Sequence, residues 1–417
     1  MQLATHHLND LGTPEPAQWL DRLARPGIRL FGKTRPSFQV CGVAGLCLAV
    51  FMSLVLVERR GLSPWILAAI AVAAVSTFLS LAMLTKIVTG AETLVYYHHE
   101  IAVISVAAVL LSVLHRPVLP YLDVTALGLG LFLACGRIGC FMVGCCHGRP
   151  HRLGVQYTPA HAHAGFTACY VGVRLLPVQL FESLWVLAVT SIGIVLLWNG
   201  ARPGEAFAWY VAMYCVGRFG LEFLRGDAER RYAWGFSEAQ WTSLLLVSGI
   251  ALAEALRPKP FVWWHAAAAA GLILTMGGVA TVRRFRKTFS HRLLHPRHLR
   301  EVAELVGRLR VPEPSTHDGV RIATTSLGIQ ISAGRQEEPE STVHHYAISS
   351  PGETLSDRSA AALGELIARL DPAPAKTGEF IRSTRGVFHF LIRVPLREVA
   401  TDASGGLQPA NHAKLTA

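Results

Sequence analysis

Four polar side chains recur at helical spacing within an apolar stretch near the middle of the chain. The segment AMYCVGRFGLEFLRGD places Tyr214, Arg218, Glu222 and Arg225 four, four and three residues apart. On a helix these four share one face. Glu222 can pair with both arginines, and the remaining positive charge suits an anionic group such as a lipid phosphate. The alternative is a helix end whose arginines extend to the membrane interface.

Two other segments place ionisable groups where apolar runs begin. In LLPVQLFESL, Gln179 and Glu182 are three residues apart and share a helical face, although Glu182 could instead answer the dipole of its own helix. In LVYYHHEIAVISV, His98 stands beside His99 and Glu100. A histidine at a membrane boundary can act as a general base, or it can belong to an interfacial Tyr and His belt.

The segment CGRIGCFMVGCCHGRP, residues 135–150, combines an arginine with many glycines. Arg137 follows an apolar run and has glycines on both sides. Glycine lets a backbone or a ligand approach closely, so these positions favour either a binding site or tight helix packing. The glycines are Gly136, Gly139, Gly144 and Gly148.

The same segment holds Cys140, Cys145 and Cys146, followed by His147. A metal site, a disulfide, a reactive thiol and buried thiols that only pack are all compatible with this pattern. Three consecutive ligands wrap a tetrahedral ion poorly, because structural sites use cysteine pairs spaced by two to four residues. We therefore expect no metal, and we keep the three cysteines as possible nucleophiles or redox groups.

The composition is that of a membrane protein. Hydrophobic residues make up 51% of the 417 residues and charged residues only 16%, where about 25% is usual for soluble domains. The net charge of +11 is typical of loops that face anionic lipid. No aromatic and basic pattern of a nucleic-acid module is present, so we predict no nucleic-acid partner, and eight cysteines do not form a disulfide framework.

Apolar windows predict an all-α polytopic membrane protein with seven or eight transmembrane helices and a small C-terminal α+β soluble appendage. The windows are 40–58, 65–86, 94–114, 119–140, 180–199, 205–224, 241–257 and 262–282. Strands are predicted in VRIATTSLGIQISAG, TVHHYAISS and GVFHFLIRVPL, and a helix with Ser356 as its N-cap in LSDRSAAALGELIARL.

These patterns divide the chain into five predicted parts. They are a polar basic N-terminal segment (1–36), a transmembrane domain (37–285), a basic juxtamembrane linker (286–300), a soluble α+β domain (301–400) and a disordered tail (401–417). The first part lacks an apolar core and a cleavage site, so we expect no cleaved signal peptide.

Several of these stretches together resemble the bacterial prolipoprotein diacylglyceryl transferases over about residues 40–260. GRIGCFMVGCCHG is similar to that family's G-R-x-G-N-F-x-N-x-E-x-x-G, with Cys140 and Val143 in place of asparagines and Cys145 in place of glutamate. LPVQLFE is similar to H-P-x-Q-L-Y-E, and YCVGRFGLEFLR to Y-G-x-x-R-x-x-x-E-x-x-R. EAQWTS is similar to G-Q-x-x-S and contributes Gln240, and YHHE aligns His98 with the family's essential histidine.

The resemblance implies a transferase of lipoprotein biosynthesis in the bacterial plasma (inner) membrane. It would move the diacylglyceryl group of phosphatidylglycerol to the lipobox cysteine of a prolipoprotein, and its partners would be these two substrates and membrane lipids. His98, Arg137 and Arg218 would be catalytic: the histidine would take the thiol proton and the arginines would hold the leaving phosphate. The implied substrate-binding residues are Tyr214, Glu222, Arg225, Gln179, Glu182, Gly136, Gly139, Gly148 and Gln240. No metal or organic cofactor is implied.

Two other hypotheses remain open. The cysteine substitutions are compatible with a related membrane enzyme that moves a lipid-derived group to another acceptor through Cys145 or Cys146 as a covalent nucleophile. They are also compatible with a non-catalytic membrane sensor whose cysteines bind metal or change redox state.

Overall fold

The computed structural model describes residues 6–8, 16–90, 96–256, 262–285, 290–310, 321–350, 355–371, 377–383 and 386–395. Residues 94–95 of the predicted third span and the predicted disordered tail (401–417) lie outside the described residues.

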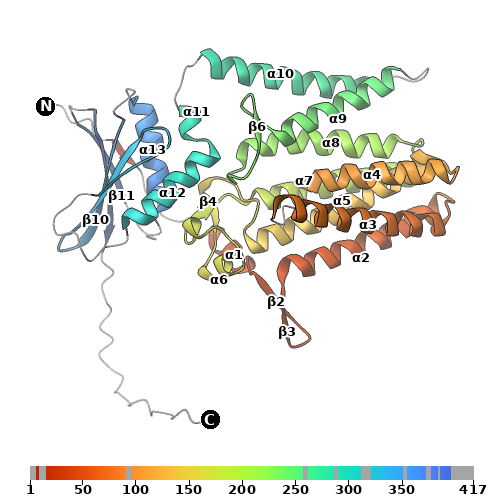
Figure 1. Ribbon diagram of the computed structural model, residues 1–417, viewed down its shortest axis with the longest axis horizontal. Coiled ribbons are helices and arrows are strands. Elements are labelled where there is room, and N and C mark those ends of the chain that lie inside the picture. Colours follow the sequence, from red (N-terminus) through yellow and green to blue (C-terminus); the bar gives the residue numbers. More distant parts are fainter. Residues whose placement is uncertain are drawn as a thin grey trace, which may run out of the picture.

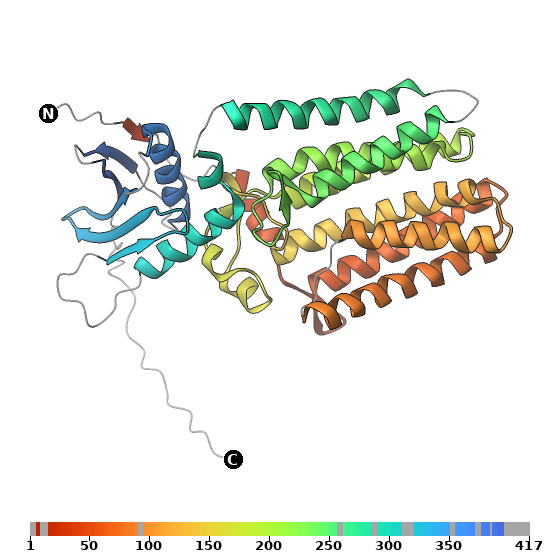
Figure 2. The same cartoon turned by 45° about the horizontal axis from the view of Figure 1, so that its top comes forward.

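Eight long helices run alongside one another and form a bundle (Figures 1 and 2). Each of them coincides with one of the eight predicted apolar windows. They are α2 (Ser37–Arg59), α3 (Pro64–Thr89), α4 (Tyr96–Val113), α5 (Val118–Val143), α7 (Val178–Trp198), α8 (Glu205–Leu221), α9 (Glu238–Ala255) and α10 (Trp263–Phe285).

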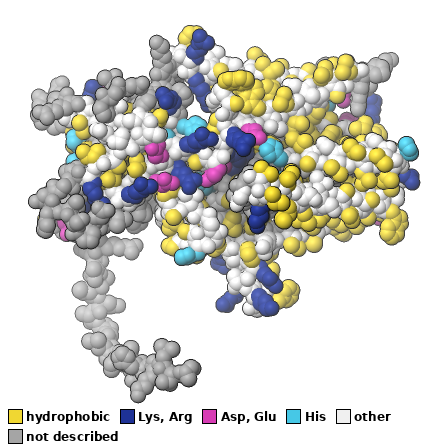
Figure 3. Space-filling model, in the orientation of Figure 1, with side chains coloured by type: hydrophobic (Ala, Val, Ile, Leu, Met, Phe, Trp, Pro, Cys, Tyr) yellow, Lys and Arg dark blue, Asp and Glu magenta, His cyan; other side chains and the backbone are white. Residues whose placement is uncertain are grey.

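Five of the described helices are long and apolar enough to cross a membrane, namely α2, α3, α5, α7 and α10. Hydrophobic side chains cover much of the visible surface of the bundle in Figure 3, as expected for a surface that faces lipid. The predicted fold class, a polytopic helical membrane protein with a small soluble appendage, is therefore confirmed. α4, α8 and α9 do not by themselves meet the length and hydropathy of a membrane span.

α5 is the central helix of the bundle. In its apolar window 61% of the residues are buried, against 11% for α3, because α2, α7 and α8 all pack against it. Asp123, the acidic residue inside this predicted span, accepts hydrogen bonds from the backbone of Gly204 (2.7 Å) and Phe207 (2.8 Å). It therefore caps the start of α8 and has a structural role.

The segment between α5 and α7 is folded. It contains β4 (Pro150–Gln156), α6 (Pro159–His163), the short 3₁₀ helix η1 (Ala168–Tyr170) and β5 (Arg174–Leu175), and β4 pairs antiparallel with β5. Val155, Phe166 and Tyr170 are buried in the same apolar core as residues of the C-terminal appendage.

The appendage is one antiparallel sheet with helices. The strand order is β1-β11-β12-β10-β9-β8, formed by β8 (Arg321–Thr324), β9 (Gln330–Glu337), β10 (Ser341–Ser349), β11 (Thr377–Arg382), β12 (Phe388–Pro395) and β1 (His6–Leu8). The helices are α11 (Ser290–Leu293), α12 (Pro296–Arg310) and α13 (Asp357–Leu370). Ser356 caps α13 as predicted, because its hydroxyl accepts from the Ser359 amide at 3.2 Å.

The sheet differs from the predicted strands in three ways. The segment VRIATTSLGIQISAG forms two strands, β8 and β9, because a turn with Gly328 in the left-handed region (φ 77°) separates them. β11 was not predicted, and β1 comes from the N-terminal segment, which also supplies α1 (Pro16–Leu23) and the hairpin of β2 (Gly27–Leu30) and β3 (Lys33–Pro36). Residues 290–300 of the predicted linker are largely helical and begin α12.

The folded α5–α7 segment and the appendage lie at the same end of the bundle (Figure 1). α13 packs on β4, α12 packs on η1, and the Arg369 guanidinium donates to the Pro150 carbonyl at 3.0 Å. α5 ends and α7 begins at this end, so the polar residues near those termini lie close to the appendage.

Candidate anion site

Glu182 connects three arginines at the buried end of the bundle. It lies one turn into α7 and its side chain has no exposed surface. Its Oε1 lies 3.1 Å from Nη2 of Arg137, and its Oε2 lies 3.0 Å from Nη1 of Arg218 and 3.6 Å from Nη1 of Arg225. The three guanidinium groups are also buried, with 8%, 4% and 0% of their side chains exposed.

Two more carboxylates complete the cluster from the other side. Glu222 binds Arg218 at 2.7 Å and also binds Arg230. Asp227 receives two hydrogen bonds from Arg225, at 2.7 and 3.1 Å, and one from Arg230 at 2.8 Å. Burial alone would raise the pKa of Asp227, but Arg225 and Arg230 outweigh it and hold that pKa below its ordinary range.

The four polar residues predicted to share one helical face do so only in part. Tyr214 and Arg218 lie on α8, which ends at Leu221, and Glu222 begins a 3₁₀ turn. Arg225 follows in an extended conformation and pairs with Gly148 in an isolated β-bridge. The extended backbone directs Arg225 to Glu182 and Asp227, so the expected pairing of Glu222 with Arg225 is replaced by the pairing of Glu222 with Arg230.

The cluster has the charge and the free donors of an anion-binding site. Four guanidinium groups face three carboxylates, so one positive charge is in excess. Among the described residues, no hydrogen-bond acceptor is found for Nε of Arg137, Nε of Arg218, Nη1 of Arg225 or the hydroxyl of Tyr214. A buried donor without an acceptor costs about 1–3 kcal/mol, and an anionic ligand would supply the acceptors.

His98 lies apart from these ion pairs. Its Nε2 is 2.9 Å from Oε1 of Glu238, the first residue of α9, and 46% of its side chain is exposed. α4 and α9 both begin at the end of the bundle where α8 finishes. The structure therefore places His98 at the accessible edge of the region, with a carboxylate that can orient its ring.

The two glutamines of the predicted site make internal hydrogen bonds. Gln179 donates to the Cys145 carbonyl at 2.7 Å and so links α7 to the turn after α5. Gln240 forms a capping box with Ser237 at the start of α9, and its amide also donates to the Phe219 carbonyl at 3.4 Å. Within the part of the chain that the structure describes, no hydrogen bond joins either glutamine to an arginine of the cluster.

The glycines of the motif differ in what surrounds them. A Cβ on Gly148 would lie 2.6 Å from Val178, and one on Gly139 would lie 3.1 Å from Cys41 on α2. Gly136 has no neighbour within 4 Å of that position. Gly139 and Gly148 thus allow close packing, whereas Gly136 leaves open space beside Arg137.

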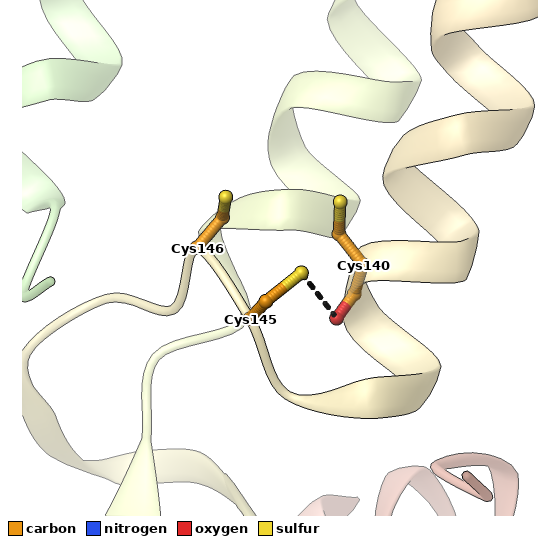
Figure 4. Close-up of side chains that lie close together, drawn as sticks. All are labelled: Cys140, Cys145 and Cys146. Atoms are coloured by element: carbon orange, nitrogen blue, oxygen red, sulfur yellow. Dashed lines mark hydrogen bonds between the residues drawn. The ribbon is translucent and has the colours of Figure 1, made fainter. Parts of the chain in front are cut away.

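Cys140, in the last turn of α5, lies beside Cys145 and Cys146 of the turn that follows (Figure 4). Their three sulfur atoms all lie within 4.8 Å of one another, and none of the eight cysteines is in a disulfide. The sulfur of Cys145 lies 3.9 Å from the Cys140 carbonyl oxygen.

Sequence reasoning missed three residues of this region. Asp227 and Arg230 follow the motif directly in LRGDAERR, where alternating charges could have indicated a paired network. Glu100 is 6% exposed on α4 and accepts a hydrogen bond of 2.7 Å from the hydroxyl of Tyr210. Its position beside His98 gave no signal that it would be buried.

The fold and the cluster define a class: a polytopic helical membrane protein with a buried, arginine-rich ion-pair cluster at one end of its bundle. The chain belongs to the prolipoprotein diacylglyceryl transferase family, whose model matches residues 37–254.

Curated relatives agree with this assignment. The chain is 36% identical over 141 residues to phosphatidylglycerol–prolipoprotein diacylglyceryl transferase 2 of Clostridium perfringens, covering 32% of this chain and 51% of the relative. It is 37% identical over 142 residues to the Streptomyces coelicolor protein of the same name, covering 32% of this chain and 43% of the relative. It is 34% identical over 158 residues to the Mycobacterium leprae transferase, covering 35% of this chain and 48% of the relative. The chain thus spans about half the length of the curated relatives it matches.

Proposed function

We propose that this chain transfers the diacylglyceryl group of phosphatidylglycerol to the lipobox cysteine of prolipoproteins in the bacterial inner membrane. The observation that carries the proposal is the buried cluster with one excess positive charge and four donors without acceptors among the described residues. A phosphodiester carries one negative charge and several acceptor oxygens, so its charge and its hydrogen-bonding groups are complementary to this cluster.

The arginines account for the leaving group. In the reaction the sulfur of the acceptor cysteine attacks the glyceryl carbon, and the bond from that carbon to the phosphate oxygen breaks. Negative charge therefore grows on the phosphate of the departing glycerol phosphate. Arg137, Arg218 and Arg225 are held in place by Glu182 before the reaction begins, so they can stabilise this charge without reorganising.

The acceptor thiol needs a base, because the thiolate is the nucleophile. We assign this role to His98, whose pairing with Glu238 orients the ring at the accessible edge of the site. The proton would pass from the thiol to the imidazole and then to water.

The test is lipid transfer by the full chain in vesicles that contain phosphatidylglycerol, with a lipobox peptide as acceptor and peptide mass as the readout. Arg137→Ala and Arg218→Ala should each lower the transfer rate by about 100-fold or more, the usual effect of removing a group that stabilises developing charge. Arg202→Ala is the matched control, since Arg202 is exposed in the loop between α7 and α8, at the far end of the bundle. Transfer at the unaltered rate in both site variants would refute the proposal. So would an adduct on a cysteine of the chain itself without a lipidated peptide.

A further inference from the structure

The turn after α5 holds three thiols in a fixed arrangement. Gly144 ends the helix in the left-handed conformation (φ 84°), and Cys146 is also left-handed, with φ 58°. A left-handed conformation is uncommon for a residue other than glycine and costs about 1 kcal/mol or more. It turns the Cys146 side chain back beside that of Cys140, so that both point in the same direction in Figure 4.

Packing on both sides keeps this turn in place. A Cβ on Gly144 would lie 2.7 Å from Phe166. The carbonyl of Cys145 accepts the hydrogen bond from Gln179, and the carbonyl of His147 accepts one of 3.0 Å from the Gly226 amide. The three sulfur positions are therefore set by the surrounding fold and do not depend on the local sequence alone.

The sulfur spacing fits a thiophilic metal ion. A Zn–S bond is about 2.3 Å long, so three thiolates around one zinc ion have their sulfurs about 3.8–4.0 Å apart. The sulfurs here all lie within 4.8 Å of one another, and changes in side-chain torsion angles can close the difference. The sequence argued against a metal because Cys145, Cys146 and His147 are consecutive. The structure uses only two of these three and adds Cys140 from the preceding helical turn.

The charge around the thiols also favours such an ion. Three thiolates and one Zn²⁺ carry a single net negative charge. Arg137 lies three residues before Cys140 on α5, and Arg225 is linked to the turn because the amide of the next residue, Gly226, bonds to the His147 carbonyl. Both guanidinium groups are buried, so positive charge lies near the thiols. This charge would stabilise the anionic centre.

The three cysteines leave the fourth position of a tetrahedral ion without a ligand from the described residues. His147 does not supply it, because neither of its ring nitrogens belongs to the group of atoms that lie within 4.8 Å of one another. Its ring packs against Tyr170, with centroids 5.1 Å apart. Three protein ligands and one open position are typical of catalytic zinc sites.

The thiol cluster adjoins the anion site on two helices. Arg137 precedes Cys140 by three residues on α5, and Gln179 precedes Glu182 by three residues on α7. Three residues of helix correspond to about 4.5 Å along the axis. A thiol at the fourth position would therefore lie near the glyceryl carbon of a lipid whose phosphate is held among the arginines.

We propose that Cys140, Cys145 and Cys146 form a zinc site whose fourth ligand is the thiol of the acceptor cysteine. The metal site stands on the thiol geometry, and the identity of the fourth ligand rests on the proposed function. Coordination deprotonates a thiol, so the site would supply the thiolate that the transfer needs. The released proton passes to His98 or to water. The sulfur then donates an electron pair to the glyceryl carbon, the C–S bond forms, and the C–O bond breaks with its electron pair leaving on the phosphate oxygen. No electron is gained or lost overall.

The first test measures metal binding by the full chain in detergent. Titration with Zn²⁺ should give one ion per chain, and Co²⁺ in its place should give the sulfur-to-metal charge-transfer absorption of a thiolate site. Cys145→Ser and Cys146→Ser should each raise the Zn²⁺ dissociation constant by about tenfold or more. Cys47→Ser is the matched control, since Cys47 is exposed on α2 away from the cluster. Thermal unfolding of each variant shows whether it is folded. Cys145 is the exposed member of the three, so Cys145→Ser should fold even if Cys146→Ser does not, and the test then rests on Cys145→Ser.

Three outcomes would overturn the metal site. The first is that the titration shows no binding of one Zn²⁺ per chain. The second is an unchanged Zn²⁺ dissociation constant in the cysteine variants. The third is a Cys140–Cys146 disulfide in protein purified without reductant.

The second test adds a lipobox peptide to the Co²⁺ protein. A cysteine peptide should shift the cobalt spectrum and a serine peptide should not. The same response to both peptides would overturn the assignment of the fourth ligand. Lipid transfer at the full rate by metal-free protein would overturn the role of the zinc in supplying the thiolate and leave the proposed function standing. A thiol-dependent spectral shift with no lipid transfer from phosphatidylglycerol would sink the proposed function and leave the metal site.

Discussion

Arg297 of α12 donates a hydrogen bond of 2.9 Å to the backbone carbonyl of Arg230. A second bond of 3.4 Å joins its Nε to the Ala228 carbonyl. The side chain of Arg230 in turn binds Glu222, which pairs with Arg218. A residue of the appendage thus holds the loop that supplies Arg230 to the buried ion-pair cluster, and the appendage takes part in positioning that cluster.

We expect Arg297→Ala to slow lipid transfer by about tenfold, because small displacements of charged groups reduce catalysis steeply. The fold should be unaffected, since Arg297 is exposed. Arg308→Ala is the matched control, because Arg308 is exposed on the same helix and lies outside this contact. Transfer rates and thermal unfolding of the three proteins provide the measurement. Equal rates for Arg297→Ala and the control would mean that the loop does not depend on α12.

Glu182→Gln should destabilise the protein severely. The substitution leaves Arg137, Arg218 and Arg225 around a neutral group, and removing one partner of a buried ion pair costs about 3–5 kcal/mol. Thermal unfolding in detergent should show a large drop in the midpoint. Glu58→Gln, on the exposed end of α2, should leave it unchanged. A midpoint equal to that of the unaltered protein would show that Glu182 is not the electrostatic centre of the cluster.

Much of the fold could be predicted from the sequence because helices in a membrane have a simple composition. All eight apolar windows are helices, and the helix after Ser356 is present with the predicted cap. The strand β1 could not be predicted, because three residues from a polar segment pair with β11 more than 360 positions later. Such a pairing depends on the tertiary fold and leaves no local periodicity.

Contacts in the candidate site could be predicted where both residues belong to one sequence motif on one helix. Arg218 and Glu222 are four residues apart and pair with each other as expected. The central role of Glu182 was not predictable in the same way, because its three partners come from three separate segments. The three cysteines were named from the sequence, but the closeness of their sulfur atoms could not be predicted. It depends on the left-handed backbone of Cys146, which no sequence rule predicts for cysteine.

The appendage should lose stability in mild acid through His345. Burial, and then repulsion from His389, whose Nδ1 lies 2.9 Å from Nε2 of His345, lower the pKa of His345 in the folded state. The unfolded chain therefore binds a proton at about pH 6.5, where the folded sheet resists it. Stability is full above that pH and declines as the pH falls toward the folded-state pKa. Hydrogen exchange of β10, corrected for the intrinsic rate at each pH, measures this, and His345→Gln should show less dependence. Equal protection of β10 at pH 7.5 and pH 5.5 would contradict the prediction.

Two glycines of one motif should respond in opposite ways to alanine. In Gly148→Ala the new Cβ would lie 2.6 Å from Val178 and 2.7 Å from the Leu176 carbonyl. The chain would have to shift, and with it the bridge from Gly148 to Arg225, at a cost of about 1–3 kcal/mol together with most of the transfer activity. Gly136→Ala meets no atom within 4 Å and lies inside α5, so alanine should stabilise that helix by about 0.5–1 kcal/mol. Thermal unfolding and transfer assays on the two variants test both effects. If Gly136→Ala abolishes transfer in a protein that unfolds at a higher temperature, the open space beside Arg137 is where the lipid approaches. If it leaves transfer unchanged, the open space at Gly136 takes no part in the reaction.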